Sequence, residues 1–267
     1  MSLILSLRIS DGIVVATDSL STSNDLLEIA SSGIEIKCPY CNKIIKDKGF
    51  KLPPIPIPFS ASSYTQKLFK FFKKYAISFS GMGILNNRSI FYHIKQFEWE
   101  NEKLKDCSID KIVEKIEEYF ESELIKAFPD YKSKAPENWV PLSFHINGYS
   151  GKDNNLHGNT YEIKIGKKNV NKIHDSIGCT IGGDVRVVSK LWEMGKIDPK
   201  QKIRYRLLTL QDAIELSEFF INTTSTFQKF ANQVPTVGGD TDIALITPFH
   251  GFTWVKRKRL DKIIEGE

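Results

Sequence analysis

The chain opens with the stretch Leu3-Ile-Leu-Ser-Leu-Arg-Ile9, turns at Asp11-Gly12 and continues as Ile13-Val-Val-Ala-Thr17. The first run is apolar at its beginning and then alternates, Asp-Gly is typical of a two-residue hairpin turn, and the second run is rich in β-branched residues. These residues predict a β-hairpin at the very start of the fold. The hairpin leaves the N-terminus at the end of a strand.

The elements expected after this hairpin follow in the order strands, helices, strands, helices, strands. They are β-rich runs at 67–72 and 75–80, a helix over 84–103, a helix capped by Ser108, strands at 140–149, 159–165 and 170–181, a short helix to about 194, a helix from Thr209 to about 230, and a closing hairpin at 237–247 and 251–255. This order suits a single α+β domain over residues 1–267. We expect a four-layer αββα sandwich, two antiparallel sheets flanked by helices.

Residues from about 23 to 63 differ from the rest of the chain. They contain Cys38-Pro-Tyr-Cys41, many lysines and the proline cluster Leu52-Pro-Pro-Ile-Pro-Ile-Pro-Phe59. Four prolines in this cluster prevent a helix and favour extended, polyproline-like chain. We therefore interpret this segment as an inserted arm.

Composition places the chain among ordinary globular proteins. Of its 267 residues, 41% are hydrophobic and 26% are charged, and no apolar run approaches the roughly 20 residues of a transmembrane helix. The 37 Lys and Arg against 32 Asp and Glu give a net charge of +5, too small to predict nucleic-acid binding without a localised patch. The dense basic run Lys256-Arg-Lys-Arg259 is interpreted as a solvated tail. We expect a cytoplasmic protein with neither a nucleic-acid nor a membrane partner, because the start lacks the pattern of a secretion signal.

In several separated stretches the chain resembles proteasome β-type subunits and bacterial proteasome-like proteins, which are N-terminal nucleophile (Ntn) hydrolases. The stretches are the first strand, Asp11-Gly-Ile-Val-Val-Ala-Thr-Asp18, Gln66-Lys-Leu-Phe69, Ile77-Ser-Phe-Ser-Gly-Met-Gly83, Ile181-Gly-Gly-Asp184, Thr209-Leu-Gln-Asp-Ala213 and Val237-Gly-Gly239. They occur in the order found in the family and cover nearly all of the chain outside the arm. The resemblance implies the Ntn hydrolase form of the αββα sandwich.

The resemblance also implies a nucleophile. In that family it is the side chain of the first residue of the mature chain, usually Thr, and the α-amino group of the same residue is the general base. Here the matching residue is Ser2, which becomes first when Met1 is removed and which keeps the hydroxyl. An α-amino group titrates at about pH 7.7–8.0, so it needs little tuning to accept a proton at cellular pH.

Three further residues match functional positions of the family. Asp18 matches the aspartate that holds a lysine and orients the amino terminus, and Lys67 matches that lysine, whose ammonium lowers the proton affinity of the neighbouring amine. Gly83 matches the glycine whose N–H forms the oxyanion hole. The implied reaction is cleavage of peptide amide bonds without a required cofactor. The implied partners are a peptide or protein substrate, further copies of the chain in a homo-oligomer, and an ATPase or regulator.

Two function classes stay open. Gly183, Val234 and Val237 stand where the family usually carries serine or aspartate side chains that support the nucleophile. Their absence favours a non-catalytic structural or binding subunit that uses the arm for interactions. The four retained residues favour an active amidohydrolase, which is the interpretation we prefer.

The cysteine pair of the arm resembles half a zinc ribbon, because Cys38 and Cys41 are spaced so that two thiolates can face one ion. Tetrahedral zinc requires two more ligands. Either Cys107 and Cys179 supply these ligands by approaching the pair in the folded chain, or two subunits each donate a pair, or there is no metal and the thiols are a redox pair or inert. A segment of roughly 40 residues with this composition cannot build its own core, so we expect it to pack against a neighbouring subunit, with any structural zinc shared across that contact.

Overall fold

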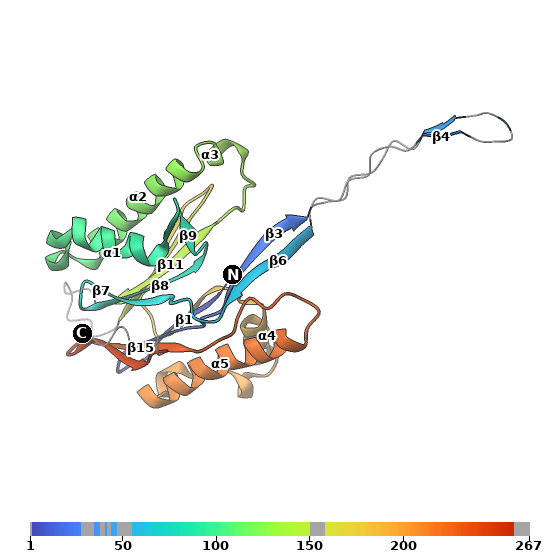
Figure 1. Cartoon of the computed structure of the whole chain (residues 1–267). Helices are drawn as coiled ribbons and strands as arrows, with labels where there is room; N and C mark the ends of the chain where they lie inside the picture. The colour runs from blue at the N-terminus through green and yellow to red at the C-terminus, as the bar shows by residue number, and fades with distance from the viewer. Residues whose placement is uncertain are drawn as a thin grey trace. The chain divides into compact units, whose positions relative to one another are not determined.

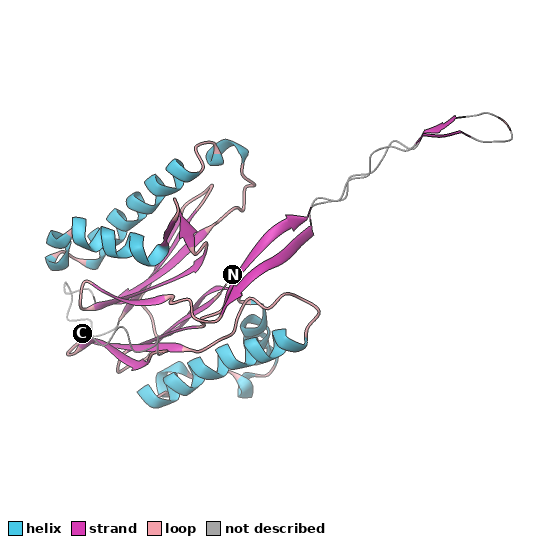
Figure 2. Ribbon diagram, viewed as in Figure 1, coloured by secondary structure: helices cyan, strands magenta, loops and turns pink. Residues whose placement is uncertain are grey.

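Ten strands pair into two five-stranded antiparallel sheets that pack together, with helices on their outer faces (Figure 1, Figure 2). The computed structural model describes residues 2–27, 35–37, 41, 44–46, 55–149 and 158–258. The chain divides into two compact units. One consists of Met1–Ser21 with Ser62–Glu267 and contains both large sheets, and the other is Thr22–Ala61.

The first sheet has the strand order β14-β1-β2-β15-β16. Its strands are β1 (Leu3–Arg8), β2 (Ile13–Thr17), β14 (Gly178–Gly183), β15 (Asp242–Thr247) and β16 (Gly251–Lys256). The predicted N-terminal hairpin is confirmed, since β1 pairs with β2 in an antiparallel register. Its two turn residues are Ser10 and Asp11 and not the predicted Asp11 and Gly12, because the Ile9 N–H donates to the Gly12 carbonyl across the turn. On its other side β1 pairs with β14, so the strand that follows Ser2 lies between two neighbours.

The second sheet has the strand order β13-β12-β11-β8-β7. Its strands are β7 (Leu68–Phe71), β8 (Tyr75–Gly81), β11 (Leu142–Gly148), β12 (Asn159–Ile165) and β13 (Val170–His174). Phe72 and Lys73, with φ of 43° and 62°, make the tight turn between β7 and β8.

Alternation along β1 explains how this strand is buried on both faces. Leu3, Leu5 and Leu7 belong to the hydrophobic cluster that includes α4 and α5 residues, whereas Ser6 and Arg8 contact strands of the second sheet. Every residue of the strand is buried. One face of β1 therefore packs on the helices and the other lies between the sheets.

The helices cover the outer faces of the sheets. On the second sheet lie α1 (Ile90–Glu100) and α2 (Ile109–Ala127), followed by the short α3 (Tyr131–Lys134), and on the first sheet lie α4 (Arg186–Ile197) and α5 (Leu210–Phe230). The predicted apolar face of α2 is buried: Ile109, Ile112, Val113, Ile116, Phe120 and Leu124. The predicted capping box of Thr209 and Asp212 starts α5.

The predicted helix over 84–103 is wrong at its beginning. Two short strands, β9 (Ile84–Leu85) and β10 (Arg88–Ser89), come first, and Asn86 and Asn87 turn between them with φ of 49° and 60°. Asparagine tolerates this left-handed conformation, so the Asn-Asn pair forms a turn where apolar periodicity indicated a helix. The helix then begins at Ile90, and a 3₁₀ turn at Glu102–Asp106 follows it.

The predicted strand over 170–181 is two strands in different sheets. β13 is an edge of the second sheet and β14 is an edge of the first. The chain crosses between the sheets at 175–177, where Arg8 Nε donates a hydrogen bond to the Ser176 carbonyl at 2.8 Å. A buried side chain distant in sequence thus holds the crossover, and no local pattern reports it.

The smaller unit, Thr22–Ala61, contains two two-stranded sheets. One pairs β3 (Ser21–Leu27) with β6 (Ile55–Ser62), and the other pairs β4 (Glu35–Lys37) with β5 (Ile44–Lys46). The prolines predicted to keep this region extended include Pro56 and Pro58, which lie in β6. Because the two prolines are two residues apart, their nitrogens face the same edge of the strand. A two-stranded sheet leaves one edge of each strand without ladder hydrogen bonds, so prolines on that edge are compatible with a strand.

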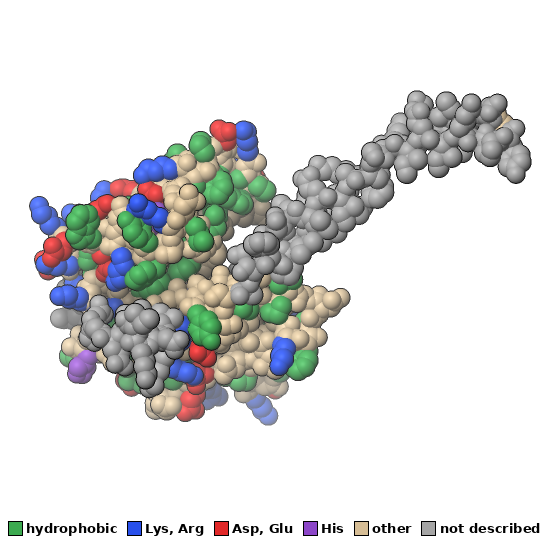
Figure 3. All heavy atoms as spheres, viewed as in Figure 1, with side chains coloured by type: hydrophobic (Ala, Val, Ile, Leu, Met, Phe, Trp, Pro, Cys, Tyr) green, Lys and Arg blue, Asp and Glu red, His purple; other side chains and the backbone are tan. Residues whose placement is uncertain are grey.

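Charged side chains of both signs are intermingled on the face of the molecule shown in Figure 3. Many are paired along the helices, as in Lys115–Glu118 and Lys126–Glu123. Over the described residues, none of the helices has the length and apolar character needed to cross a membrane.

The space between the two sheets is part apolar and part polar. The apolar part consists of Ile13, Val15, Leu68, Ala76, Ala244, Ile246 and Phe252. In the polar part, Arg8 Nη1 donates to Thr160 Oγ1 and Thr180 Oγ1 at 2.8 and 2.7 Å and so joins β12 to β14. Ser6 Oγ and His145 Nδ1, 3.2 Å apart, join β1 to β11.

The buried His145 predicts a loss of stability in mild acid. Burial lowers its pKa to about 3, whereas an unfolded histidine titrates near pH 6.5. Between these values the unfolded chain binds more protons, so the free energy of unfolding falls as pH drops, with a slope approaching ~1.4 kcal/mol per pH unit. Urea unfolding of wild type and His145→Gln at pH 7, 6 and 5 measures this, because the glutamine variant should lose that part of the slope. Equal slopes in the two proteins would contradict the assignment.

Candidate functional site

The predicted pair of Asp18 and Lys67 is present and buried. Asp18 follows β2 directly, Lys67 immediately precedes β7, and Lys67 Nζ lies 3.0 Å from Asp18 Oδ1. The two side chains are 0% and 2% exposed. The Lys67 ammonium also donates to the Leu20 carbonyl. The fold thus brings together two residues that are 49 positions apart in the sequence.

Asp18 ties three segments of backbone together. Its Oδ1 accepts the Leu3 N–H at 3.0 Å, and its Oδ2 accepts the N–H groups of Leu20 and Gly238 at 3.1 and 3.0 Å. The same carboxylate therefore holds Lys67 and the peptide unit that directly follows Ser2. This arrangement places the ion pair beside the start of β1.

Ser2 itself is buried, and its backbone is closely fitted. Its carbonyl accepts the Asp184 N–H at 2.6 Å. Gly183, with φ of +81°, lies so close that a Cβ there would be 1.8 Å from the Ser2 carbonyl oxygen and 3.2 Å from Ser80 Cβ. Only glycine fits this approach. The end of β14 and the end of β8 therefore meet at Ser2.

A hydrogen-bonded network supports this turn. Asp184 Oδ2 accepts from Thr236 Oγ1 at 2.6 Å and from Gln228 Nε2 at 2.9 Å. Hydrogen bonds from Arg186, with further help from Thr236, lower the pKa of Asp184 to about 2. The family pattern indicated missing side chains at Gly183, Val234 and Val237, but a carboxylate and a hydroxyl are present one residue away. Because Asp184 is already fully engaged, its part here is to position backbone.

Sequence reasoning missed a second buried ion pair. Lys258 Nζ lies 2.6 Å from Asp242 Oδ2, with side chains 2% and 0% exposed, and the Lys258 N–H donates to Asp242 Oδ1. The interpretation of residues 256–259 as a solvated tail is therefore wrong at Lys258. No local pattern could have found it, because strand alternation places Lys256 and Lys258 on the same face, yet Lys256 is exposed and pairs with Glu218 whereas Lys258, two residues past the end of β16, is buried.

The two ion pairs are neighbours. Asp242 is opposite Thr17 in the register of β15 and β2, and Lys258 Nζ donates to the carbonyl of Thr65, two residues before Lys67. Burial is the main cause that lowers the pKa of Lys67, Asp18 opposes it, and the charge of Lys258 adds to it. Two lysines and two aspartates thus lie close together near the start of β1.

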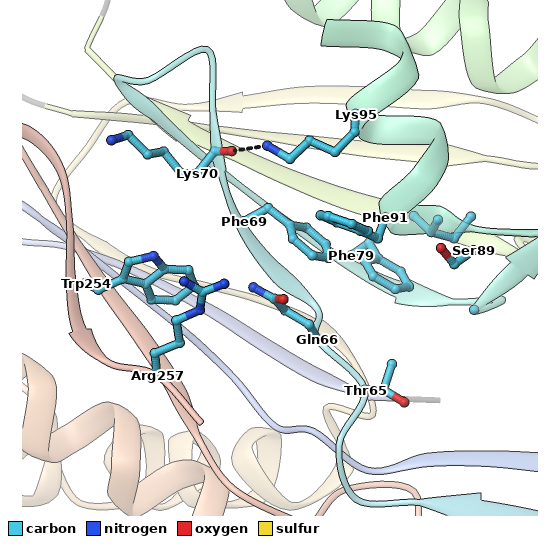
Figure 4. A pocket seen from close by; sticks show the side chains of 12 residues that line it. Thr65, Gln66, Phe69, Lys70, Phe79, Ser89, Phe91, Lys95, Trp254 and Arg257 are labelled. Carbon is cyan, nitrogen blue, oxygen red and sulfur yellow. Dashed lines mark hydrogen bonds between the residues drawn. The ribbon is translucent and has the colours of Figure 1, made fainter. Parts of the chain in front are cut away.

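Gly83 lines a pocket close to the Lys67 segment (Figure 4). The pocket has a volume of about 470 Å³, and its wall includes Thr65 and Gln66, the two residues before Lys67. Its aromatic and cationic lining is Phe69, Phe79, Phe91, Trp254, Lys70, Lys95 and Arg257. Arg257 lies over the Trp254 ring at 5.2 Å. The site can hold an apolar group next to cations.

Gly81, at the end of β8, and Gly83, two residues later, have different surroundings. Gly81 has φ of +108°, and a Cβ there would lie 2.1 Å from the Pro141 carbonyl oxygen, whereas a Cβ on Gly83 would meet no atom within 4 Å. In the described part of the chain, the Gly83 N–H is not a donor in any hydrogen bond. Gly81 is therefore required by the fold, and Gly83 leaves its donor and its space open.

The proposed zinc ligands are only partly within the described residues. Cys38 lies outside them, Cys41 is an exposed free thiol, and Cys107 and Cys179 are half-buried. Within the described ranges, no group of three or more His, Cys, Asp or Glu side chains could hold a metal ion. Zinc shared between arms stays a prediction.

Neither a known protein-family model nor a curated protein matches this chain. The contacts around Ser2 are therefore the observations that bear on the two function classes.

Loss of the Lys258 ammonium should destabilise the fold strongly. In Lys258→Met the buried Asp242 carboxylate loses its cation, which costs about 3–5 kcal/mol for buried pairs. Lys256→Met, two residues earlier, removes an exposed pair worth at most ~1 kcal/mol. Chemical denaturation of both variants measures the difference, and similar losses in the two would show that Lys258 is not buried as described.

The two glycines should respond oppositely to alanine. Gly81→Ala is expected to cost more than ~2 kcal/mol of unfolding free energy, because of its positive φ and the overlap with the Pro141 carbonyl. Gly83→Ala should stay within about 0.5 kcal/mol of wild type. Thermal and urea unfolding test this, and a Gly83→Ala protein as unstable as Gly81→Ala would refute the description of an open site.

Proposed function

We propose that this chain is a proteasome-like N-terminal nucleophile hydrolase that cleaves peptide amide bonds, with Ser2 as nucleophile after Met1 is removed. The observation that carries the proposal is the buried Lys67–Asp18 pair. Its carboxylate holds the Leu3 N–H, so a lysine ammonium is fixed beside the residue that begins β1. The Ntn form of the two-sheet sandwich is part of the same proposal.

The base in this mechanism is the α-amino group of Ser2. A free α-amine titrates at about pH 7.7–8.0, and a nearby positive charge lowers that value further. Lys67 supplies the charge, and Asp18 keeps the ammonium in place. The amine is therefore largely unprotonated near neutral pH and can accept the Ser2 hydroxyl proton.

The hydroxyl oxygen then attacks the substrate carbonyl and forms a tetrahedral intermediate. The carbonyl carbon–nitrogen bond breaks, the leaving amine takes the proton from the Ser2 ammonium, and an ester with Ser2 remains. Water, activated by the same amine, hydrolyses the ester. The Gly83 N–H, which is free in the described structure, is the proposed donor to the oxyanion.

The lining of the pocket beside Gly83 indicates which type of substrate side chain the hydrolase would prefer. Four aromatic rings favour an apolar or aromatic side chain of a peptide, and the cations Lys70 and Arg257 favour a negative charge near it, whereas Lys95 is already paired with Glu98. Assembly into a homo-oligomer, with an ATPase or regulator that delivers protein substrates, belongs to the proposal.

A non-catalytic subunit is the second candidate, and Gly183, Val234 and Val237 are the residues that favour it. In that case the Lys67 and Asp18 pair would only brace the strands. The two candidates differ in what happens after Met1 is removed, because only the hydrolase acquires turnover.

Turnover of a peptide panel by protein with verified Met1 removal tests the proposal. Ser2→Ala, which still allows Met1 removal, should lose activity by about 10³-fold or more, while Ser2→Thr should retain it. Lys67→Met should also lose activity, whereas Lys73→Met, an exposed turn lysine, should not.

Intact mass and thermal unfolding of every variant serve as controls. A Ser2→Ala protein as active as wild type would refute the nucleophile. A folded wild type with a free Ser2 amine and no turnover on any peptide would favour the non-catalytic subunit.

A further inference from the structure

A second cavity lies under α4, along the edge strand β14. It has a volume of about 410 Å³, within the usual size range of small-molecule sites. Its lining residues are Cys179, Leu191, Trp192, Gly195, Lys196, Gln201, Lys202, Ile203 and Tyr205. None of these residues belongs to the site around Ser2.

The walls of this cavity are held by packing. The Trp192 ring meets Phe220 of α5 edge to face, with ring centroids 6.5 Å apart. A Cβ on Gly195 would lie 3.0 Å from Lys202 Cα, so α4 and the segment after the 3₁₀ turn at Pro199–Gln201 approach closely there. Asp198 accepts hydrogen bonds from the Lys200 N–H and from Gln201 Nε2, which hold that turn. The cavity is therefore built from anchored elements.

One buried polar atom at this cavity makes no well-formed hydrogen bond. Trp192 Nε1 meets no acceptor at hydrogen-bond distance and angle among the described residues, and the Tyr205 hydroxyl is a polar neighbour that interacts with it. A buried donor without a full hydrogen bond is destabilising, and a ligand that offers a well-placed acceptor would satisfy it.

The charge of the lining has one sign. Lys196 and Lys202 are exposed and form no ion pair with any described residue, whereas the nearby Glu193 is paired with Lys190. Burial raises the pKa of the Cys179 thiol to about 12 and also raises the pKa of Tyr205, so both stay neutral near pH 7. Two cations and no carboxylate line the cavity.

We propose that this cavity binds a small amphipathic carboxylate, with its apolar chain against Leu191, Trp192 and Ile203 and its carboxylate on the side of the two lysines. A carboxylate oxygen supplies a well-placed acceptor for the indole N–H, and its charge complements Lys196 and Lys202. A neutral alcohol of the same length has no negative charge to pair with Lys196 or Lys202. This binding site is independent of whether Ser2 is catalytic.

Octanoate is the probe, and 1-octanol is its neutral counterpart. The chain has four tryptophans, so its ¹H–¹⁵N spectrum carries four indole signals, and Trp192→Phe identifies the one that belongs to Trp192. Octanoate should shift this signal and bind with one site per chain by calorimetry. Lys196→Gln/Lys202→Gln should weaken octanoate about 10-fold and leave 1-octanol binding unchanged.

Lys200→Gln is the matched control, because Lys200 is an exposed lysine of the same turn outside the lining. It should bind octanoate like wild type. The double lysine variant changes exposed side chains and should fold normally, which thermal unfolding checks. Failure of octanoate to bind wild type, a shift of other indoles instead of Trp192, or equal affinities in the double variant and Lys200→Gln would each overturn the proposal.

Discussion

The structure depends on one buried carboxylate. Asp18 accepts hydrogen bonds from Lys67, Leu3, Leu20 and Gly238, and neither it nor Lys67 reaches solvent. Burying two charges is costly, and such a pair is retained only when further hydrogen bonds satisfy it. Those bonds are to backbone from the start of β1 and from the segments after β2 and before β15. The backbone hydrogen bonds that offset this desolvation also fix the positions of the strand ends around Ser2.

The second pair extends this constraint to the segment that follows β16. Lys258 holds both Asp242 and the Thr65 carbonyl, so the last described residue braces the segment that carries Lys67. The pocket beside Gly83 is shaped by the same segment and by Arg257, next to Lys258 in the chain. Stability and the proposed chemistry therefore draw on the same four charged groups. A change in either pair is expected to alter both.

Polarity divides the interior of the molecule by layer. The helix-facing clusters are apolar, whereas the space between the sheets also holds Arg8, His145 and several hydroxyl groups. His145 Nε2 has no partner among the described residues and lies near Gly182, where a Cβ would be 3.1 Å away. Protonation of His145 is therefore expected to weaken the contact between the sheets. The cavity under α4 lies on the other side of the first sheet's edge strand, so its ligand would act without contacting this layer.

Local pattern by itself determined the N-terminal hairpin, the apolar face of α2, the capped start of α5 and the α+β class, because each depends on residues close in sequence. It also singled out Asp18 and Lys67, through their resemblance to a family, and the structure brings these two together. It could not determine that 84–89 forms a hairpin or that 170–181 crosses between two sheets, since the Arg8 contact that holds the crossover is distant in the chain. The burial of Lys258 and of the Trp192 indole N–H was likewise decided by tertiary structure, because solvation depends on which distant segments cover a side chain.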